Sequence, residues 1–334
     1  MMRAAYFESH GPTANIKVGE RPAPELGAED VLIRVRAASV NGFDPMVLQG
    51  TTGLRTPLPM IPLGDCAGEV VATGAEVEGF AVGDRVCPFP FVAGEGMTGE
   101  TRLGVAAEYA RFPYRNLIRM AEGVSFEQAA CLPIAYGTAY RMLYARGTVR
   151  AGERVLILGA TGGVGVSAIQ LAKAIGCEVV ACGNAPWKLA KLREIGADQV
   201  IDTSCEDFVA AVHAAFGKPK MLGGGGVDVV INYIGGDTWA DSLKCLRRGG
   251  RLLTCGATAG YDPPEDIRYI WTFELNVLGC NGWMPSDQIA LLDMVAGGRL
   301  EPRIHDVRDL DGVAGAIQDL IDRKVFGKLV IRPS

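Results

Sequence analysis

The sequence lacks a long apolar run, an excess of positive charge and any pair of cysteines spaced as Cys-x-x-Cys. Apolar stretches such as residues 155–158 fall far short of the roughly 20 residues that span a bilayer, so we expect no membrane segment. The net charge of −5 gives the chain no electrostatic attraction for nucleic acid, and we expect no nucleic-acid partner. The first residues do not resemble a secretory signal, so we expect a cytoplasmic protein.

The nine cysteines exclude two further classes of protein. Their odd number does not fit a disulfide framework, and their spacing does not fit a zinc knuckle. Most of them lie in apolar runs, as in Leu-Thr-Cys255-Gly and Val-Ala-Cys182-Gly. Small buried thiols are common in such positions, so we expect reduced cysteines in the core.

The first 120 residues or so indicate short strands separated by turns. Residues 31–37 alternate apolar and polar side chains, which is typical of a half-buried strand. Residues 68–74 and 83–88 follow with Gly, Asp and Pro at their ends. Residues 92–104 are predicted to form a Gly-rich loop.

From about residue 124 the pattern changes to strands alternating with helices. Repeated units of this kind predict a parallel sheet with right-handed crossovers. The predicted strands are residues 154–158, 177–182, 199–202, 227–232 and 250–255, and the predicted helices are residues 164–175, 188–195 and 206–216. Later come a helix over 287–296, another helix and a last strand over 328–332, which we expect to return to the N-terminal part. The predicted domains are therefore 1–121 with 298–334, and an inserted dinucleotide-binding domain over 122–297.

The strongest local motif is Leu158-Gly-Ala-Thr-Gly-Gly-Val-Gly165, which follows an apolar strand and opens a helix. A glycine fingerprint in this context binds the pyrophosphate of a dinucleotide. We expect Gly162 to let the backbone approach the phosphates, and Gly165 to let the helix pack closely on the strand. The amides of Gly163 and Val164 then point at the phosphates from a helix N-terminus.

The end of the next strand predicts which nicotinamide cofactor is bound. Sites for NAD normally place Asp or Glu there for the ribose hydroxyls, whereas this chain has no carboxylate between Cys182, at the end of the strand, and Glu194. Gly183 leaves room for a 2′-phosphate, Asn184 can donate a hydrogen bond and Lys188 supplies positive charge. We therefore expect NADP(H), although Lys188 alone is also compatible with a solvated helix start.

Together with these features, motifs along nearly the whole chain resemble the medium-chain dehydrogenase/reductase superfamily, in its zinc-free quinone oxidoreductase and enoyl reductase branches. The motifs are Ser39-Val-Asn-Gly-Phe-Asp44, Ile61-Pro-Leu-Gly-Asp-Cys-Ala-Gly-Glu-Val70, Gly83-Asp-Arg-Val86, Leu132-Pro-Ile-Ala-Tyr-Gly-Thr-Ala-Tyr140, Gly196-Ala-Asp-Gln-Val-Ile-Asp202 and Gly327-Lys-Leu-Val330. The resemblance implies an α/β fold in which a doubly wound Rossmann domain is inserted in a mostly-β GroES-like catalytic domain. It also implies an oxidoreductase that acts on a small molecule.

The zinc ligands of the alcohol dehydrogenases in this superfamily are not found here. The matching positions look like Asn41, Asp65 and Ile134. Isoleucine cannot bind a metal and asparagine is a poor zinc ligand, so we expect no metal site. Without a Lewis acid, hydride transfer to an already polarised C=C bond or quinone is easier to achieve than alcohol oxidation.

The resemblance also suggests where the remaining parts of the site lie. Asn41 is expected beside the nicotinamide, as a catalytic and cofactor-binding residue, with a turn-forming role as the alternative. Other expected cofactor contacts are Thr138, Thr161, Gly256, Ala257, Thr258, Asn281 and Gly282. Thr52 stands where enoyl reductases often carry a tyrosine proton donor, so water or another tyrosine such as Tyr136 would have to protonate the product.

Three functions follow from these expectations. The first is an NADPH-dependent reductase of quinones, enones, enals or enoyl thioesters that works without zinc. The second is an alcohol dehydrogenase of the same superfamily, and the third is an NADPH-binding protein without catalytic activity. Residues 276–283 resemble the edge strand that relatives pair across a two-fold axis, which suggests a homodimer.

Overall fold

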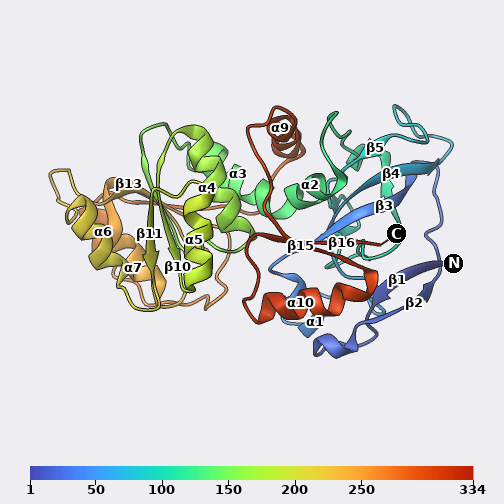
Figure 1. Ribbon diagram of the computed structural model, residues 1–334, viewed down its shortest axis with the longest axis horizontal. Helices are drawn as coiled ribbons and strands as arrows, with labels where there is room; N and C mark the ends of the chain where they lie inside the picture. The colour runs from blue at the N-terminus through green and yellow to red at the C-terminus, as the bar shows by residue number, and fades with distance from the viewer. Residues whose placement is uncertain (334) are drawn as a thin grey trace. The chain divides into compact units, whose positions relative to one another are not determined.

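The computed structural model describes residues 1–333 and divides into two compact units (Figure 1). The first unit contains residues 1–135 and the chain from residue 285 onward, and the second contains residues 136–284. The second unit is therefore an insertion in the first. Within the described residues, no helix is both long and apolar enough to cross a membrane.

The second unit is built on one six-stranded sheet in which all pairs of strands are parallel. Its strands are β9 (Arg154–Ile157), β10 (Glu178–Gly183), β11 (Gln199–Asp202), β12 (Val227–Ile231), β13 (Leu246–Thr254) and β14 (Asn276–Gly279). They are ordered β11-β10-β9-β12-β13-β14. This is the doubly wound order of dinucleotide-binding folds, and it confirms the predicted fold class.

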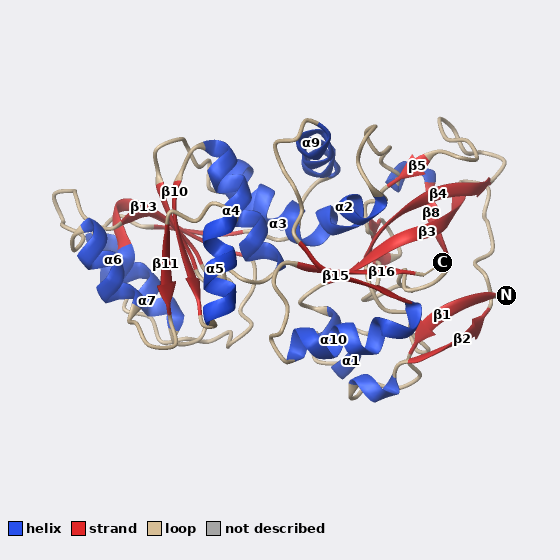
Figure 2. Ribbon diagram, viewed as in Figure 1, coloured by secondary structure: helices blue, strands red, loops and turns tan. Residues whose placement is uncertain are grey.

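Helices cover both faces of this sheet, which explains why β9 and β10 contain continuous apolar runs. The helices are α3 (Gly137–Tyr140), α4 (Gly163–Ile175), α5 (Pro186–Glu194), α6 (Phe208–Phe216), α7 (Thr238–Cys245) and α8 (Arg268–Thr272). Figure 2 shows α4 and α5 on one side of the strands and α6 and α7 on the other. Val155, Leu156 and Ile157 of the central strand β9 are consequently fully buried.

The first unit is organised around β3, the longest strand of its main sheet. The strands of that sheet are β3 (Asp30–Val40), β4 (Asp65–Thr73), β5 (Arg85–Val86), β8 (Tyr109–Pro113), β15 (Ile304–Asp309) and β16 (Lys328–Arg332). β3 pairs antiparallel with β4, β8 and β16. The pairing with β16 confirms that the last strand returns to the N-terminal part of the chain.

Shorter elements complete the first unit. They are β1 (Met2–Tyr6), β2 (Lys17–Arg21), β6 (Phe91–Val92), β7 (Gly96–Met97), α1 (Asp44–Gln49), α2 (Phe126–Cys131), α9 (Pro285–Ala296) and α10 (Val313–Ile321). The Gly-rich stretch 92–104, predicted as a loop, contains the short strand β7 and the last residue of β6, with which β7 pairs antiparallel.

The helices α2 and α9 belong to the first unit, whereas the sequence-based domain bounds assign them to the cofactor domain. Two hydrogen bonds explain their position. The Ser39 hydroxyl of β3 donates to the Ala130 carbonyl of α2 at 2.8 Å, and the Gln288 side chain of α9 donates to the Cys87 carbonyl at 3.0 Å. Such contacts between distant segments leave no local signal in the sequence.

All nine cysteines are free. Seven of them are buried, and only Cys205 is exposed, while Cys255 is partly exposed. Burial raises the pKa of the Cys177 thiol to about 11 and that of Cys182 to about 12. These thiols are therefore protonated near neutral pH, in agreement with the predicted core cysteines.

Candidate functional site

The turn between β9 and α4 forms an open helix N-terminus. Gly162 is the N-cap of α4 and, as a glycine, has no side chain that could cap the first amides of the helix. The first amide that bonds within the helix is that of Val166, which donates to the Gly162 carbonyl at 2.9 Å. The amides of Gly163 and Val164 thus have no acceptor within the helix. An uncapped helix N-terminus of this kind is suited to an anion such as a pyrophosphate.

The glycines of this turn have different roles. A Cβ atom on Gly165 would lie 2.4 Å from the Gly159 carbonyl oxygen, so this position needs glycine for the close approach of helix and strand. A Cβ atom on Gly162 would meet nothing closer than 3.8 Å. Gly162 therefore leaves free space, as expected for a position that faces a ligand. The two glycines can be tested separately.

Two residues that the sequence analysis missed shape the same edge of the sheet. The Tyr233 hydroxyl, just after β12, donates to the Gly159 carbonyl at 2.5 Å. Burial raises the pKa of Tyr233 well above its usual range, so the phenol remains a donor. Asn232 is fully buried, and its side-chain oxygen accepts from the amides of Ile234 and Gly235. Both lie where the strand order reverses, between β9 and β12, which is the usual ligand crevice of such sheets.

The end of β10 contains the residues expected near a ribose phosphate. Gly183 ends the strand, and its carbonyl accepts from the Thr203 amide at 2.8 Å. Lys188 is only 4% exposed, and its ammonium lies 5.3 Å from the centre of the Trp187 ring. Lys191 lies at the same distance from that ring. Lys188 is therefore not a solvated side chain at a helix start.

The other predicted cofactor residues are distributed over the second unit. Thr161 lies in the β9–α4 turn, and Thr138 is a buried residue of α3. Three more, Gly256, Ala257 and Thr258, follow β13, and the last two, Asn281 and Gly282, follow β14. Because they follow parallel strands, these five residues lie at the carboxyl edge of the sheet with the β9–α4 turn. Asn41, in contrast, belongs to the first unit.

In the first unit, Asn41 is part of a buried polar cluster. Its side-chain nitrogen donates to Asp65 Oδ2 at 2.9 Å, and its side-chain oxygen accepts from the Lys328 ammonium at 2.5 Å. Lys328 also donates to the Val40 carbonyl at 2.8 Å and lies 3.8 Å from Asp65 Oδ2. The Ile134 amide is 3.3 Å from both oxygens of Asp65. Sequence reasoning missed Lys328, which looks like the first residue of an ordinary strand.

Asp44 is the second buried carboxyl group beside Asn41. Its Oδ2 accepts from the Asn41 backbone amide at 2.6 Å, while its Oδ1 has no hydrogen-bond partner among residues 1–333. Burial raises the pKa of Asp44 to about 7, against the opposing effects of the Asn41 amide and Lys328. Burial likewise raises the pKa of Asp65 to about 6, against the effect of Lys328.

The residues of this cluster do not fit a catalytic zinc ion. Of the three positions that match zinc ligands, Ile134 has no donor atom in its side chain and Asn41 offers an amide. The Lys328 ammonium already binds the amide oxygen and faces the carboxylate of Asp65. Elsewhere in residues 1–333, no group of three or more His, Cys, Asp or Glu side chains is arranged to hold a metal.

Neither Tyr136 nor Thr52 is a strong proton donor. Tyr136 is fully buried, and its hydroxyl donates to Gln170 Oε1 at 2.8 Å. Thr52 is partly exposed, and its hydroxyl oxygen accepts from the Leu54 amide at 3.3 Å. An aliphatic hydroxyl is a poor acid, and the tyrosine proton is already engaged.

Two protein families match the two parts of the chain. The family described as "Alcohol dehydrogenase GroES-like domain" matches residues 27–122, and the family described as "Zinc-binding dehydrogenase" matches residues 163–297. A quinone oxidoreductase from Homo sapiens is 31% identical over 99% of this chain and 98% of its own length. The chain belongs to the medium-chain dehydrogenase/reductase superfamily. Within that superfamily it lies in the branch of quinone oxidoreductases and enoyl reductases.

Other relatives in the superfamily carry different activities in their names. An acryloyl-coenzyme A reductase from Sulfurisphaera tokodaii is 28% identical over 97% of this chain and 98% of its own length. A solved structure described as an NAD-dependent alcohol dehydrogenase has a TM-score of 0.92, with 31% identity and full coverage of both chains. Membership of the superfamily therefore establishes an oxidoreductase fold, while the substrate has to be inferred from this chain's own residues.

The two glycines of the fingerprint should respond differently to substitution. We expect Gly165→Ala to lower the free energy of unfolding by about 1–3 kcal/mol, because its Cβ atom would overlap the Gly159 carbonyl. We expect Gly162→Ala to keep the melting temperature but to weaken dinucleotide binding by roughly tenfold or more, because its methyl group points into free space beside the helix N-terminus. Thermal unfolding and fluorescence titration measure the two effects. Equal losses of stability in both variants would contradict this division of roles.

The buried carboxyl of Asp44 should make part of the stability depend on pH. Its pKa in the folded protein, about 7, lies above the ordinary value of 3.8, so its contribution is full below pH 4 and is lost as the pH rises through 7. Asp44→Asn keeps an acceptor for the Asn41 amide and cannot ionise. We expect the variant to gain stability relative to the wild type, on the order of 2–4 kcal/mol, between pH 4 and pH 8. Urea unfolding at several pH values measures this difference, and a difference independent of pH would refute the assignment.

Proposed function

We propose that the protein is an NADPH-dependent reductase that transfers hydride to a quinone or to an activated C=C bond of an enone, enal or enoyl thioester, without zinc. The observation that carries the proposal is the cluster of Asn41, Asp65 and Lys328, which contains an ammonium where zinc-dependent members of the superfamily would need metal ligands. The names of two relatives, a quinone oxidoreductase and an acryloyl-coenzyme A reductase, support the substrate class.

The preference for NADPH is supported by the end of β10. Along the chain the nearest carboxylate after the strand is Glu194, the last residue of α5, so β10 is not followed by the acidic residue that binds the ribose hydroxyls in NAD sites. Gly183, Asn184 and Lys188 would hold the phosphate, with Lys188 supplying the positive charge. The amides of Gly163 and Val164 would bind the pyrophosphate.

When bound, the cofactor supplies the hydride. The chain's own residues then need to bind the acceptor, exclude water and stabilise the oxygen on which negative charge develops. Asn41 is the residue that we assign to this last task, because its side chain is a neutral donor held by charged groups on both sides. A product proton supplied by water is consistent with the engaged hydroxyl of Tyr136.

The assembly and location that we propose are a homodimer in the cytoplasm. β14 is at one edge of the parallel sheet, and within residues 1–333 it pairs only with β13. An exposed strand edge of this kind is available for pairing with a second copy. The nine free cysteines are typical of a reducing compartment.

The cofactor preference can be measured with one substitution. We expect the wild type to prefer NADPH over NADH by at least tenfold in kcat/KM. In Lys188→Met the KM for NADPH should rise by roughly 10–30-fold while the KM for NADH changes little, since only one of them carries the 2′-phosphate. Lys173→Met, which removes a lysine from the last turn of α4, is the control. A wild type that uses NADH as efficiently as NADPH would refute this proposal.

The reaction and the role of metal can be tested together on the purified protein. We expect reduction of at least one member of a panel of quinones, enones and enoyl-CoA thioesters, no stoichiometric zinc by elemental analysis, and full activity after treatment with a chelator. The alternative is an alcohol dehydrogenase, which the similarity to the solved structure with a TM-score of 0.92 supports. Stoichiometric zinc, together with alcohol oxidation that a chelator abolishes, would overturn the proposal in favour of that activity.

A further inference from the structure

The cluster around Asn41 contains a lysine whose burial calls for an explanation. Lys328 is 2% exposed and Asp65 is fully buried, and charged side chains are rarely buried so deeply unless they have a function or a partner. The two groups are 3.8 Å apart, so they do not form a close ion pair. The shortest contact of the ammonium is instead with the side-chain oxygen of Asn41, at 2.5 Å.

Strand pairing explains how these groups meet. β16 runs antiparallel to β3 with Leu329 opposite Val40, so Lys328 comes opposite Asn41, just beyond the end of β3. On the other side of β3, Asp65 of β4 lies opposite Ser39 of β3. Asn41 is therefore held between an ammonium from one neighbouring strand and a carboxylate from the other.

This arrangement determines which way the Asn41 amide points. An ammonium can only donate hydrogen bonds, and an ionised carboxylate can only accept them. The amide oxygen must therefore face Lys328, and the amide nitrogen must face Asp65, as observed. In a flipped amide, the nitrogen would face the Lys328 ammonium, which is also a donor, and the oxygen would face the Asp65 carboxylate, which is also an acceptor. Both unfavourable contacts would be buried.

We propose that Lys328 is a positioning residue of the reductase site, which together with Asp65 fixes the Asn41 amide so that it presents an N–H donor to the oxygen of the bound acceptor. One N–H of Asn41 is used by Asp65, and the nearest acceptor for the other is the Ser39 carbonyl at 3.4 Å, a long contact that can be exchanged for a better one. An ammonium bound to the amide oxygen also draws electron density from the nitrogen, which strengthens the N–H as a donor.

The catalytic part of this inference rests on the proposed function. In a zinc enzyme, a metal ion would polarise the oxygen of the substrate directly. Here the charge of Lys328 acts through Asn41 and does not touch the substrate itself. The site would thus stabilise a developing enolate or hydroquinone oxygen with an oriented and polarised amide.

The decisive variant removes both charges at once. Lys328→Met alone leaves the Asp65 carboxylate buried without its cation, so it can fail to fold, whereas Lys328→Met combined with Asp65→Asn removes the pair together. In this double variant we expect kcat to fall about a hundredfold, while the dissociation constant for NADPH and the melting temperature stay close to those of the wild type. Adding Asn41→Ala to the double variant should lower kcat by less than about threefold, although Asn41→Ala alone should lower it about a hundredfold.

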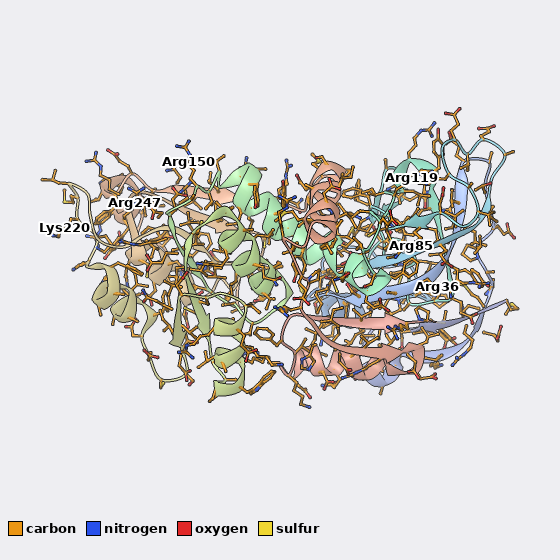
Figure 3. The ribbon with its side chains drawn as sticks, turned by 45° about the horizontal axis from the view of Figure 1, so that its top comes forward. Arg36, Arg85, Arg119, Arg150, Lys220 and Arg247 are labelled. Carbon is orange, nitrogen blue, oxygen red and sulfur yellow. The ribbon has the colours of Figure 1, made fainter. Side chains whose placement is uncertain are left out.

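An ion pair between β3 and β4 provides a matched control. Arg36 of β3, labelled in Figure 3, pairs with Glu69 of β4 at 2.7 Å, and both side chains are about one-third exposed. Arg36→Met combined with Glu69→Gln should leave kcat unchanged. A Lys328→Met/Asp65→Asn variant with a kcat within threefold of the wild type would overturn the proposal. Parallel losses of kcat, NADPH binding and melting temperature would also overturn it, since they would indicate a structural role only.

A readout without turnover separates this inference from the proposed function. Asn41 is one of seven asparagines, so selective ¹⁵N labelling with an Asn41→Ala reference identifies its side-chain amide signals. We expect these protons to exchange with water at least tenfold faster in the Lys328→Met/Asp65→Asn variant than in the wild type. If the wild type reduces none of the panel substrates, the proposed function is wrong. If the Asn41 amide protons exchange equally fast in the wild type and in the double variant, the inference that Lys328 and Asp65 fix this amide is wrong.

Discussion

The first unit is built from both ends of the chain, and it depends on the pairing of β16 with β3. This pairing brings Lys328 beside Asn41, residues that are 287 positions apart in the sequence. Both chain segments also contribute to one core, which includes Val31 and Ile33 from β3 and Leu329 and Ile331 from β16. Without this return, Asn41 would be an ordinary polar residue after a strand, and Asp65 would be a buried carboxyl without a cation.

The second unit offers neutral groups, mainly backbone amides, as the binding site for an anion. Its turn between β9 and α4 offers backbone amides, and the helix dipole favours an anion at that end. The close approach of α4 to β9 at Gly165 and the hydroxyl of Tyr233 on the Gly159 carbonyl hold the turn in shape. At the edge of this region a charged group, the ammonium of Lys188, is buried beside Trp187. Binding of a dinucleotide and stabilisation of a reacting oxygen are thus assigned to structurally separate groups.

Members of one superfamily can differ in chemistry while sharing nearly every strand. This chain is about as similar to a protein described as an alcohol dehydrogenase as to a quinone oxidoreductase, at 31% identity to each. The overall similarity therefore does not distinguish the two activities, and the distinction has to be inferred from side chains of the first unit. Our proposal of a zinc-free reductase rests on the amide of Asn41, the apolar side chain of Ile134 and the ammonium of Lys328, which are poor partners for a zinc ion.

The sequence by itself determined the features that depend on neighbouring residues. The period of apolar residues predicted β3 and the parallel strands, and the spacing of glycines predicted the turn into α4, because strand burial and helix starts are local properties. The absence of an acidic residue directly after β10 is also visible in the local sequence. Only the tertiary structure decided that α2 and α9 pack with the first unit, that Tyr233 supports the glycine turn and that Lys328 orients Asn41. Each of these depends on a contact between segments far apart in the chain. A local sequence pattern does not predict which distant side chain will form a buried hydrogen bond.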